Sequence, residues 1–206
     1  MAQSSDPKLV EFLTSDRNVR CVLEVLRHGE AIRARLTERF WSGLKTHMKN
    51  AARTNAAKKL KWEAGSWAKG KEAWVRLDAQ ISQFKDSPQN LSFSIEYYTS
   101  PDGLDLYYGL RWKKETRPSS KLFSAKHVLN LRRLLEREDY ELTDQECWCG
   151  WKYVRRFSGP DDFLSFFVEN RNVLFQSVSD GFWPFVEHTI SHVGKVNRSL
   201  KAKQAR

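Results

Sequence analysis

Apolar residues in the first quarter of the chain recur every three or four positions, which is the period of an amphipathic helix. Between Asp6 and Ala57 these are Leu9, Val10, Leu13, Val22, Val25, Leu26, Ile32, Leu36, Phe40, Leu44 and Met48. A break is expected near Gly29, because a glycine just past a basic last turn commonly ends a helix. The pattern therefore predicts two or three N-terminal helices.

An alternating pattern in the middle of the chain predicts a β-hairpin. Apolar and polar residues alternate from Leu91 to Tyr97, Ser100-Pro101-Asp102-Gly103 has turn chemistry, and the chain returns from Leu104 to Trp112. On the return strand Leu106, Tyr108, Leu110 and Trp112 share one face, and Tyr107, Gly109, Arg111 and Lys113 share the other. An antiparallel sheet with one basic, aromatic face is expected.

The remaining segments complete an α+β domain. Residues 75–81 favour a strand, although Trp74, Leu77, Ile81 and Phe84 would also suit a helix. A helix capped by Ser120 or Ser124 runs to about Glu138, and residues 146–157 suit another strand. Helices follow after Ser158 and after Pro184. We therefore expect N-terminal helices, a short antiparallel sheet of three to four strands interrupted by a helix, and C-terminal helices. Residues 1–206 are predicted to form a single domain, with a basic mobile loop around residues 50–71 and a frayed basic tail at residues 197–206.

Charge narrows the choice of partner. The chain carries 35 basic and 25 acidic residues, a net charge of +10. The excess lies in residues 45–76, residues 111–133 and the tail. The first window holds nine basic and two acidic residues, and the second holds eight and one, so each has a net charge of +7. Clustered positive charge attracts polyanions, and nucleic acid is the first to consider.

Two tryptophans stand apart from the others. Trp41, Trp112, Trp151 and Trp183 occupy apolar-face positions and are expected to pack in the core. Trp62 and Trp67 lie among lysines, where stacking on bases would explain them. The predicted nucleic-acid-binding residues are Lys58, Lys59, Lys61, Trp62, Trp67, Lys69, Lys71, Arg111 and Lys113. Without a base-reading motif, contact with the phosphate backbone is expected.

The cysteine count and the hydropathy indicate in which cellular compartment the protein is expected. Three cysteines argue against a disulfide framework and favour a reducing cytoplasm. No apolar run approaches the roughly 20 residues of a membrane span. The start of the chain lacks the features of a signal peptide, so neither export nor a membrane partner is expected.

A succession of short motifs resembles a known family. It comprises Arg39-Phe40-Trp41-Ser42-Gly43-Leu44, a basic loop with tryptophan, Leu91-Ser92-Phe93-Ser94-Ile95-Glu96, Leu106-Tyr107-Tyr108-Gly109-Leu110 and Cys147-Trp148-Cys149-Gly150-Trp151-Lys152-Tyr153. This order is similar to the C-terminal half of PD-(D/E)XK-superfamily nuclease-like proteins of prokaryotic defence loci. The resemblance implies an α+β core and a setting of bacterial or phage conflict over DNA.

The chain departs from that family at its catalytic motif. Members that cut DNA need an acid and an (Asp/Glu)-x-Lys pair to bind the metal and position the attacking water. The only such triplet here is Asp6-Pro7-Lys8, in the N-terminal segment. The remaining catalytic candidates are Glu96, Asp102, Asp105 and Lys113, which would require Mg²⁺. Zinc ligation by Cys147, Cys149, His188 and His192 is conceivable, but their spacing is not that of a zinc knuckle, so we predict neither metal site nor cofactor.

These observations favour a non-catalytic nucleic-acid-associated protein, a subunit or inhibitor in bacterial or phage defence, that binds the phosphate backbone through its basic patches. Two alternatives remain open. In the first alternative, the chain is a divergent metal-dependent nuclease that uses the acidic residues of the hairpin. In the second, it is a basic interaction module that docks on an acidic protein or within a larger nucleoprotein complex.

Overall fold

The computed structural model describes residues 6–52, 60–69, 72–84, 90–112, 125–143 and 147–204, with side chains omitted at 67–69, 72–74 and 201–204. The chain divides into two compact units, residues 1–42 and 43–206. The first contains α1 (Pro7–Thr14), α2 (Val19–Arg27) and the start of α3 (Gly29–Ala51). Asp6 caps α1 by accepting a hydrogen bond from the Lys8 backbone N–H.

The second unit is built on a five-stranded antiparallel sheet. Its strands are β1 (Leu60–Lys69), β2 (Glu72–Ile81), β3 (Leu91–Ser100), β4 (Gly103–Trp112) and β5 (Trp148–Phe157). The strands are neighbours in chain order, β1-β2-β3-β4-β5. The short 3₁₀ helix η2 (Ser82–Phe84) follows β2, and α5 (Lys126–Arg137) lies between β4 and β5 in the chain. The predicted α+β class is confirmed, but the sheet has five strands and not three to four.

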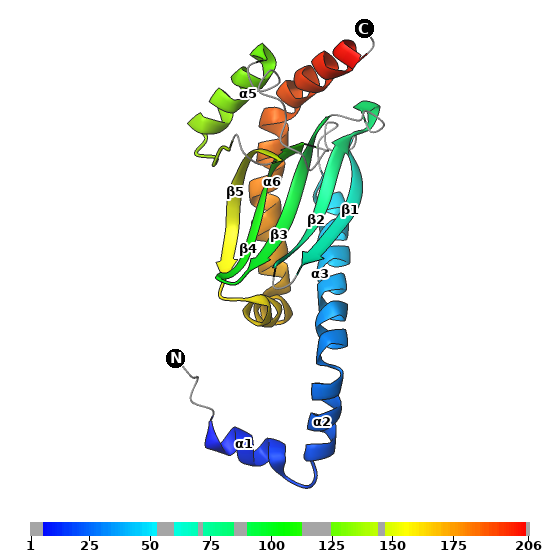
Figure 1. Cartoon of the computed structure of the whole chain (residues 1–206), viewed down its shortest axis with the longest axis vertical. Helices are drawn as coiled ribbons and strands as arrows, with labels where there is room; N and C mark the ends of the chain where they lie inside the picture. Colours follow the sequence, from blue (N-terminus) through cyan, green and yellow to red (C-terminus); the bar gives the residue numbers. More distant parts are fainter. Residues whose placement is uncertain are drawn as a thin grey trace. The chain divides into compact units, whose positions relative to one another are not determined.

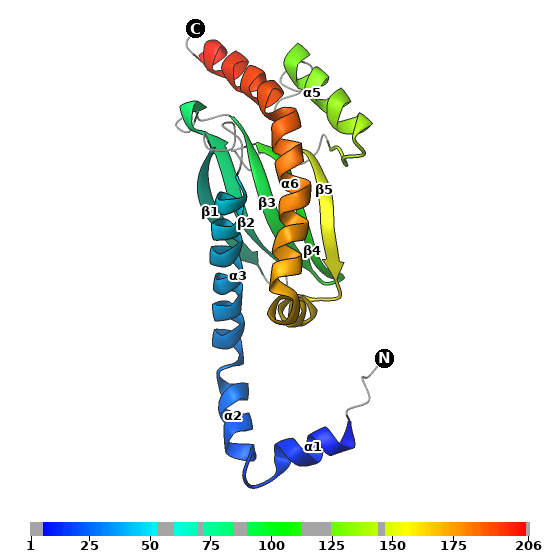
Figure 2. The ribbon, with the colours of Figure 1, turned by 180° about the vertical axis from the view of Figure 1, so that it is seen from behind.

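Helix α6 (Pro160–Gln204) covers one face of this sheet (Figures 1 and 2). The apolar sets of neighbouring strands point toward it, because side chains alternate between the two faces of a sheet. The Phe93 ring lies 6.3 Å from that of Phe182 and 5.8 Å from that of Phe185, and the Tyr108 ring lies 5.5 Å from Phe185. The core of the second unit is therefore a layer of aromatic and aliphatic side chains between the sheet and α6.

Strand β1 takes the place of ten of the 22 residues of the predicted basic loop, of which residues 53–59, 70 and 71 lie outside the described part of the chain. We expected a loop over residues 50–71, yet α3 continues to Ala51 and Leu60–Lys69 pair in register with β2. Leu60 and Trp62 alternate with Lys61 and Glu63 as in a half-buried strand, but Ala64-Gly65-Ser66 dilutes the pattern with poor strand formers. Pairing with β2 overrides that weak local preference.

The C-terminal segment is also more ordered than predicted. The chain stays helical to Gln204, with one interruption at Asn170, where φ and ψ are −127° and 31°. Residues from 197 onward were expected to fray, but Asn197 and Leu200 are buried. The side chain of Asn197 accepts a hydrogen bond from the Leu91 N–H at 2.8 Å and donates one to the Leu91 carbonyl at 3.0 Å. This side chain ties the end of α6 to the start of β3.

Smaller differences concern the cap of α5 and the predicted core tryptophans. Ala125 is the N-cap of α5 and makes no side-chain capping bond, and the predicted caps Ser120 and Ser124 lie outside the described residues. Trp41, Trp112 and Trp183 are buried as predicted. Trp151 is only half-buried. Within the described residues, no helix is both long enough and apolar enough to cross a bilayer.

Replacing Asn197 with alanine is expected to destabilise the protein by about 2–4 kcal/mol, because it leaves two buried backbone groups of Leu91 without partners. Urea unfolding of the full chain measures this loss. Lys195→Ala, at an exposed position on the same helix, is the matched control and is expected to change stability by less than about 0.5 kcal/mol. Equal effects of the two substitutions would contradict the assigned role of Asn197.

Candidate functional site

The sheet face that points away from α6 carries polar, charged and aromatic side chains. In Figure 1 this face is turned toward the viewer, and within the second unit no described helix lies across it. We call it the open face. Its residues come from all five strands: Lys61, Glu63, Arg76, Asp78, Gln80, Ser92, Ser94, Glu96, Tyr98, Asp105, Tyr107, Arg111, Trp148, Trp151, Tyr153 and Arg156.

Glu96 lies at the centre of the open face and is only 4% exposed. The Tyr107 hydroxyl donates a hydrogen bond of 2.5 Å to one carboxylate oxygen, and Arg111 Nε lies 3.9 Å from the other. Burial raises the pKa of Glu96 from 4.5 to about 7, even though Tyr107 and Arg111 both act to lower it. This carboxyl group therefore changes charge near neutral pH.

A second group of polar side chains links the neighbouring strands. Asp78 on β2 accepts a hydrogen bond of 2.9 Å from Arg76 Nε and one of 2.6 Å from the Ser94 hydroxyl on β3. Gln80 donates to Glu63 on β1 at 2.9 Å. The polar side chains of the central strands thus bind one another, which offsets the cost of placing them at low exposure.

Toward β5 the open face becomes aromatic. The Tyr107 ring lies 5.2 Å from Trp148 and 6.0 Å from Tyr153, and Trp148 lies 6.5 Å from Trp151. The Arg156 guanidinium sits over the Tyr153 ring at 4.0 Å, and its Nε is 3.4 Å from Asp105. Because Trp151 and Tyr153 are half-buried and the Arg156 side chain is 65% exposed, this edge offers aromatic surface and a cation to solvent.

Gly109 allows β5 to run close beside β4 at this edge. A Cβ atom on Gly109 would lie 2.2 Å from the Gly150 carbonyl oxygen and 2.7 Å from Trp151 Cα. The pairing of β4 with β5 is irregular on both sides of this point, between Leu106 and Tyr107 and between Leu110 and Arg111. The absence of a side chain at Gly109 therefore helps to set the position of Trp151.

The structure corrects several of the predicted nucleic-acid-binding residues. Lys61 is exposed on the open face, as a phosphate contact requires. Trp62 lies on the opposite side of β1, 5.8 Å from Phe182 and 6.1 Å from Trp183, so it packs toward α6 and does not stack freely. Arg111 is 4% exposed and stands opposite Ser92 in the β3–β4 register, and its long side chain reaches to 3.9 Å from Glu96 on the same face.

The other predicted contacts cannot be placed at the level of side chains. Lys58, Lys59, Lys71 and Lys113 lie outside the described residues. Trp67 and Lys69 belong to β1 by their backbone only. The predicted binding residues did not include Trp151, Tyr153 or Arg156. The alternation of Trp151 and Tyr153 with Lys152 was the available signal, since it places these aromatic side chains together on one face.

The acidic residues of the hairpin have separate surroundings. Glu96 bonds to Tyr107, Asp105 pairs with Arg156, and Asp102 lies exposed in the turn, where its backbone N–H donates to the Ser100 hydroxyl. Cys149 is buried, and burial raises the pKa of the half-buried Cys147 thiol. Among the described residues, no group of three or more His, Cys, Asp or Glu side chains is arranged to hold a metal ion.

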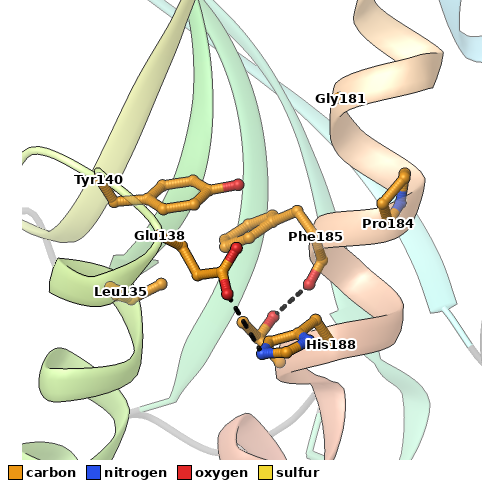
Figure 3. Close-up of a pocket in the computed structure, with 8 residues that line it drawn as sticks. Leu135, Glu138, Tyr140, Gly181, Pro184, Phe185 and His188 are labelled. Atoms are coloured by element: carbon orange, nitrogen blue, oxygen red, sulfur yellow. Dashed lines mark hydrogen bonds and ion pairs between the residues drawn. The ribbon is translucent and has the colours of Figure 1, made fainter.

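A hollow of about 170 Å³ lies between α5 and α6, on the other side of the sheet from the open face (Figure 3). Tyr140 stacks on Phe185 at 4.8 Å, and His188 lies 3.8 Å from Glu138. Burial raises the pKa of Tyr140 above its ordinary value of 10. These side chains contact one another across the hollow and join α5 to α6.

Comparison of the chain with protein-family models, with curated proteins and with solved structures gave no match.

Glu96 is expected to make stability depend on pH. Below pH 4.5 the carboxyl is protonated in both the folded and the unfolded chain, whereas between pH 4.5 and 7 only the folded chain keeps the proton. The contribution of Glu96 to stability therefore falls as pH rises through this window, by roughly 3 kcal/mol in total. Glu96→Gln cannot lose a proton, so its stability relative to wild type should rise between pH 5 and pH 8.

Urea unfolding of wild type and Glu96→Gln at a series of pH values measures this difference. Glu136→Gln, at an exposed position on α5, is the control and should track the wild type. A constant difference between Glu96→Gln and wild type across the series would contradict the assignment.

Proposed function

We propose that this protein is a non-catalytic binding protein for single-stranded nucleic acid and that the open face is its binding surface. In this proposal bases stack on Trp151 and Tyr153, and Arg156 and Lys61 bind phosphates. The observation that carries it is the Trp151–Tyr153–Arg156 edge, where half-buried rings and an exposed guanidinium lie on a sheet face that no described helix of the second unit covers.

The chemistry of this edge suits single strands. An unpaired base has an accessible π face, and stacking on an aromatic side chain is worth about 1–3 kcal/mol per base whatever the base is. A duplex hides these faces. The net charge of +10 adds a general attraction for the phosphate backbone. A role in bacterial or phage defence is supported only by the family resemblance described above, and the properties of the open face do not bear on it.

The nuclease alternative is supported by no specific observation on the described residues. The three hairpin acids contact different partners, and one of them, Glu96, is held by Tyr107 within the polar centre of the sheet. The open face supports binding better than it supports bond cleavage.

Fluorescence anisotropy with labelled single strands of about 15 nucleotides, DNA and RNA, tests the proposal at two salt concentrations. Trp151→Ala and Tyr153→Ala are each expected to weaken binding by about 5- to 100-fold, through loss of a stacked base. Arg156→Ala should weaken binding less and reduce the slope of log K against log salt by about 0.7. Duplex of the same sequence should bind more weakly than the single strand.

Lys195→Ala is the charge-matched control for Arg156→Ala, because it removes one exposed cation from α6, behind the sheet. If this control weakens binding as much as Arg156→Ala does, the attraction is general and the open face is not the site. Unchanged affinity in both aromatic variants, with circular dichroism showing intact folds, would also reject the proposal.

A further inference from the structure

The N-terminal unit leaves apolar side chains uncovered. Ten large hydrophobic residues are exposed in the described chain, and seven of them lie between positions 9 and 32, with exposures of 42–70%. They are Leu9, Val10, Phe12, Leu23, Val25, Leu26 and Ile32. We call residues 6–42 the arm. Three short successive helical segments cannot enclose so much apolar surface by themselves.

Helix α2 shows the division of polar and apolar residues most clearly. Arg20, Glu24 and Arg27 are spaced by four and three positions and share one side. All the other residues of α2 are Val, Leu or Cys and cover the remaining surface. Part of that surface, at Val19 and Val22, is half-buried within the arm, but Leu23, Val25 and Leu26 stay exposed. The exposed side of α2 is therefore an apolar contact surface.

Several charged side chains of the arm form ion pairs within α2 and within α3. Arg27 lies 2.8 Å from Glu24, Arg33 lies 2.8 Å from Glu30, and Arg35 pairs with Glu38. Residues 1–42 hold seven basic and six acidic residues, a net of +1, which leaves +9 of the total +10 on residues 43–206. The arm thus lacks the positive charge of the rest of the chain.

The near-neutral charge of the arm favours a second copy of the arm as its partner over an acidic protein or an anionic membrane. An acidic protein would be drawn to residues 43–206, and an anionic membrane favours helices whose polar side is rich in Lys and Arg. The polar side of α2 instead places Glu24 between two arginines. A second copy of the arm has the same apolar surface and the same balanced charges, so a two-fold contact is complementary without like-charge repulsion.

We propose that the protein self-associates through this arm, with α1 and α2 of two copies packing their apolar sides together as a helical bundle. Two open faces then belong to one particle, and a strand long enough to reach both binds more tightly than a short one. The self-association does not depend on the proposed binding of nucleic acid.

Light scattering after size exclusion and sedimentation velocity measure the oligomeric state of the full chain from about 1 to about 100 µM, a range that reveals weak to moderate interfaces. The wild type is expected to be a dimer. Val25→Glu should raise the dissociation constant at least about tenfold, because it places a carboxylate in the apolar contact. Leu26→Lys is a second variant with the same expected direction.

Val168→Glu on α6 is the matched control, since Val168 is 62% exposed and Val25 is 57% exposed. It should leave the dimer intact. A wild type that is monomeric at every concentration overturns the proposal. This holds even if the arm is then found to bind vesicles of anionic lipid or to dock on its own chain. Equal effects of Val25→Glu and Val168→Glu overturn it as well.

The affinity of a short oligonucleotide separates this proposal from the previous one. Val25→Glu should bind a strand of about 8 nucleotides, too short to bridge two copies, as tightly as wild type does. A loss of this affinity in Val25→Glu would show that the arm contributes to the nucleic-acid site and would contradict a role limited to self-association.

Discussion

The packing of one sheet face on α6 is the constraint from which the rest of the second unit follows. Rings from β3, β4 and α6, among them Phe93, Tyr108, Phe182 and Phe185, form the centre of that layer. Because side chains alternate along a strand, fixing the apolar set against α6 fixes the alternate set on the opposite side. The open face is thus set by the core.

The register between neighbouring strands determines which side chains of the open face stand opposite one another. Glu96 stands opposite Tyr107, and Asp78 stands opposite Ser94. These pairs satisfy much of the hydrogen bonding of a polar layer with little exposure, and such a layer makes the register costly to change. At the β5 edge the same alternation brings Trp151 and Tyr153 to the surface beside Arg156, where the close approach at Gly109 holds the backbone.

Strong local patterns were sufficient to predict the β-hairpin and the α+β class, because alternation and turn chemistry act within a few residues. The expected helix start after Pro184 was wrong, since Pro184 lies inside α6. Strand β1 was missed because Ala64-Gly65-Ser66 hides its alternation, and only pairing with β2 reveals it. The role of Trp62 depends on which side of that strand faces α6. Arg111 was taken for a surface cation because its partner, Glu96, lies on another strand. The side of β1 that faces α6 and the partner of Arg111 both depend on contacts between distant segments, which a short window of sequence does not contain.

Photo-crosslinking tests the central claim most directly. A single-stranded oligonucleotide with thio-substituted bases is irradiated in complex with the full chain, and the crosslinked peptides are identified by mass spectrometry. The account predicts crosslinks at Trp151 and Tyr153 on β5, since short-range photoreaction requires bases stacked on those rings. Crosslinks confined to α5 and the C-terminal end of α6, with none on the open face, would contradict it.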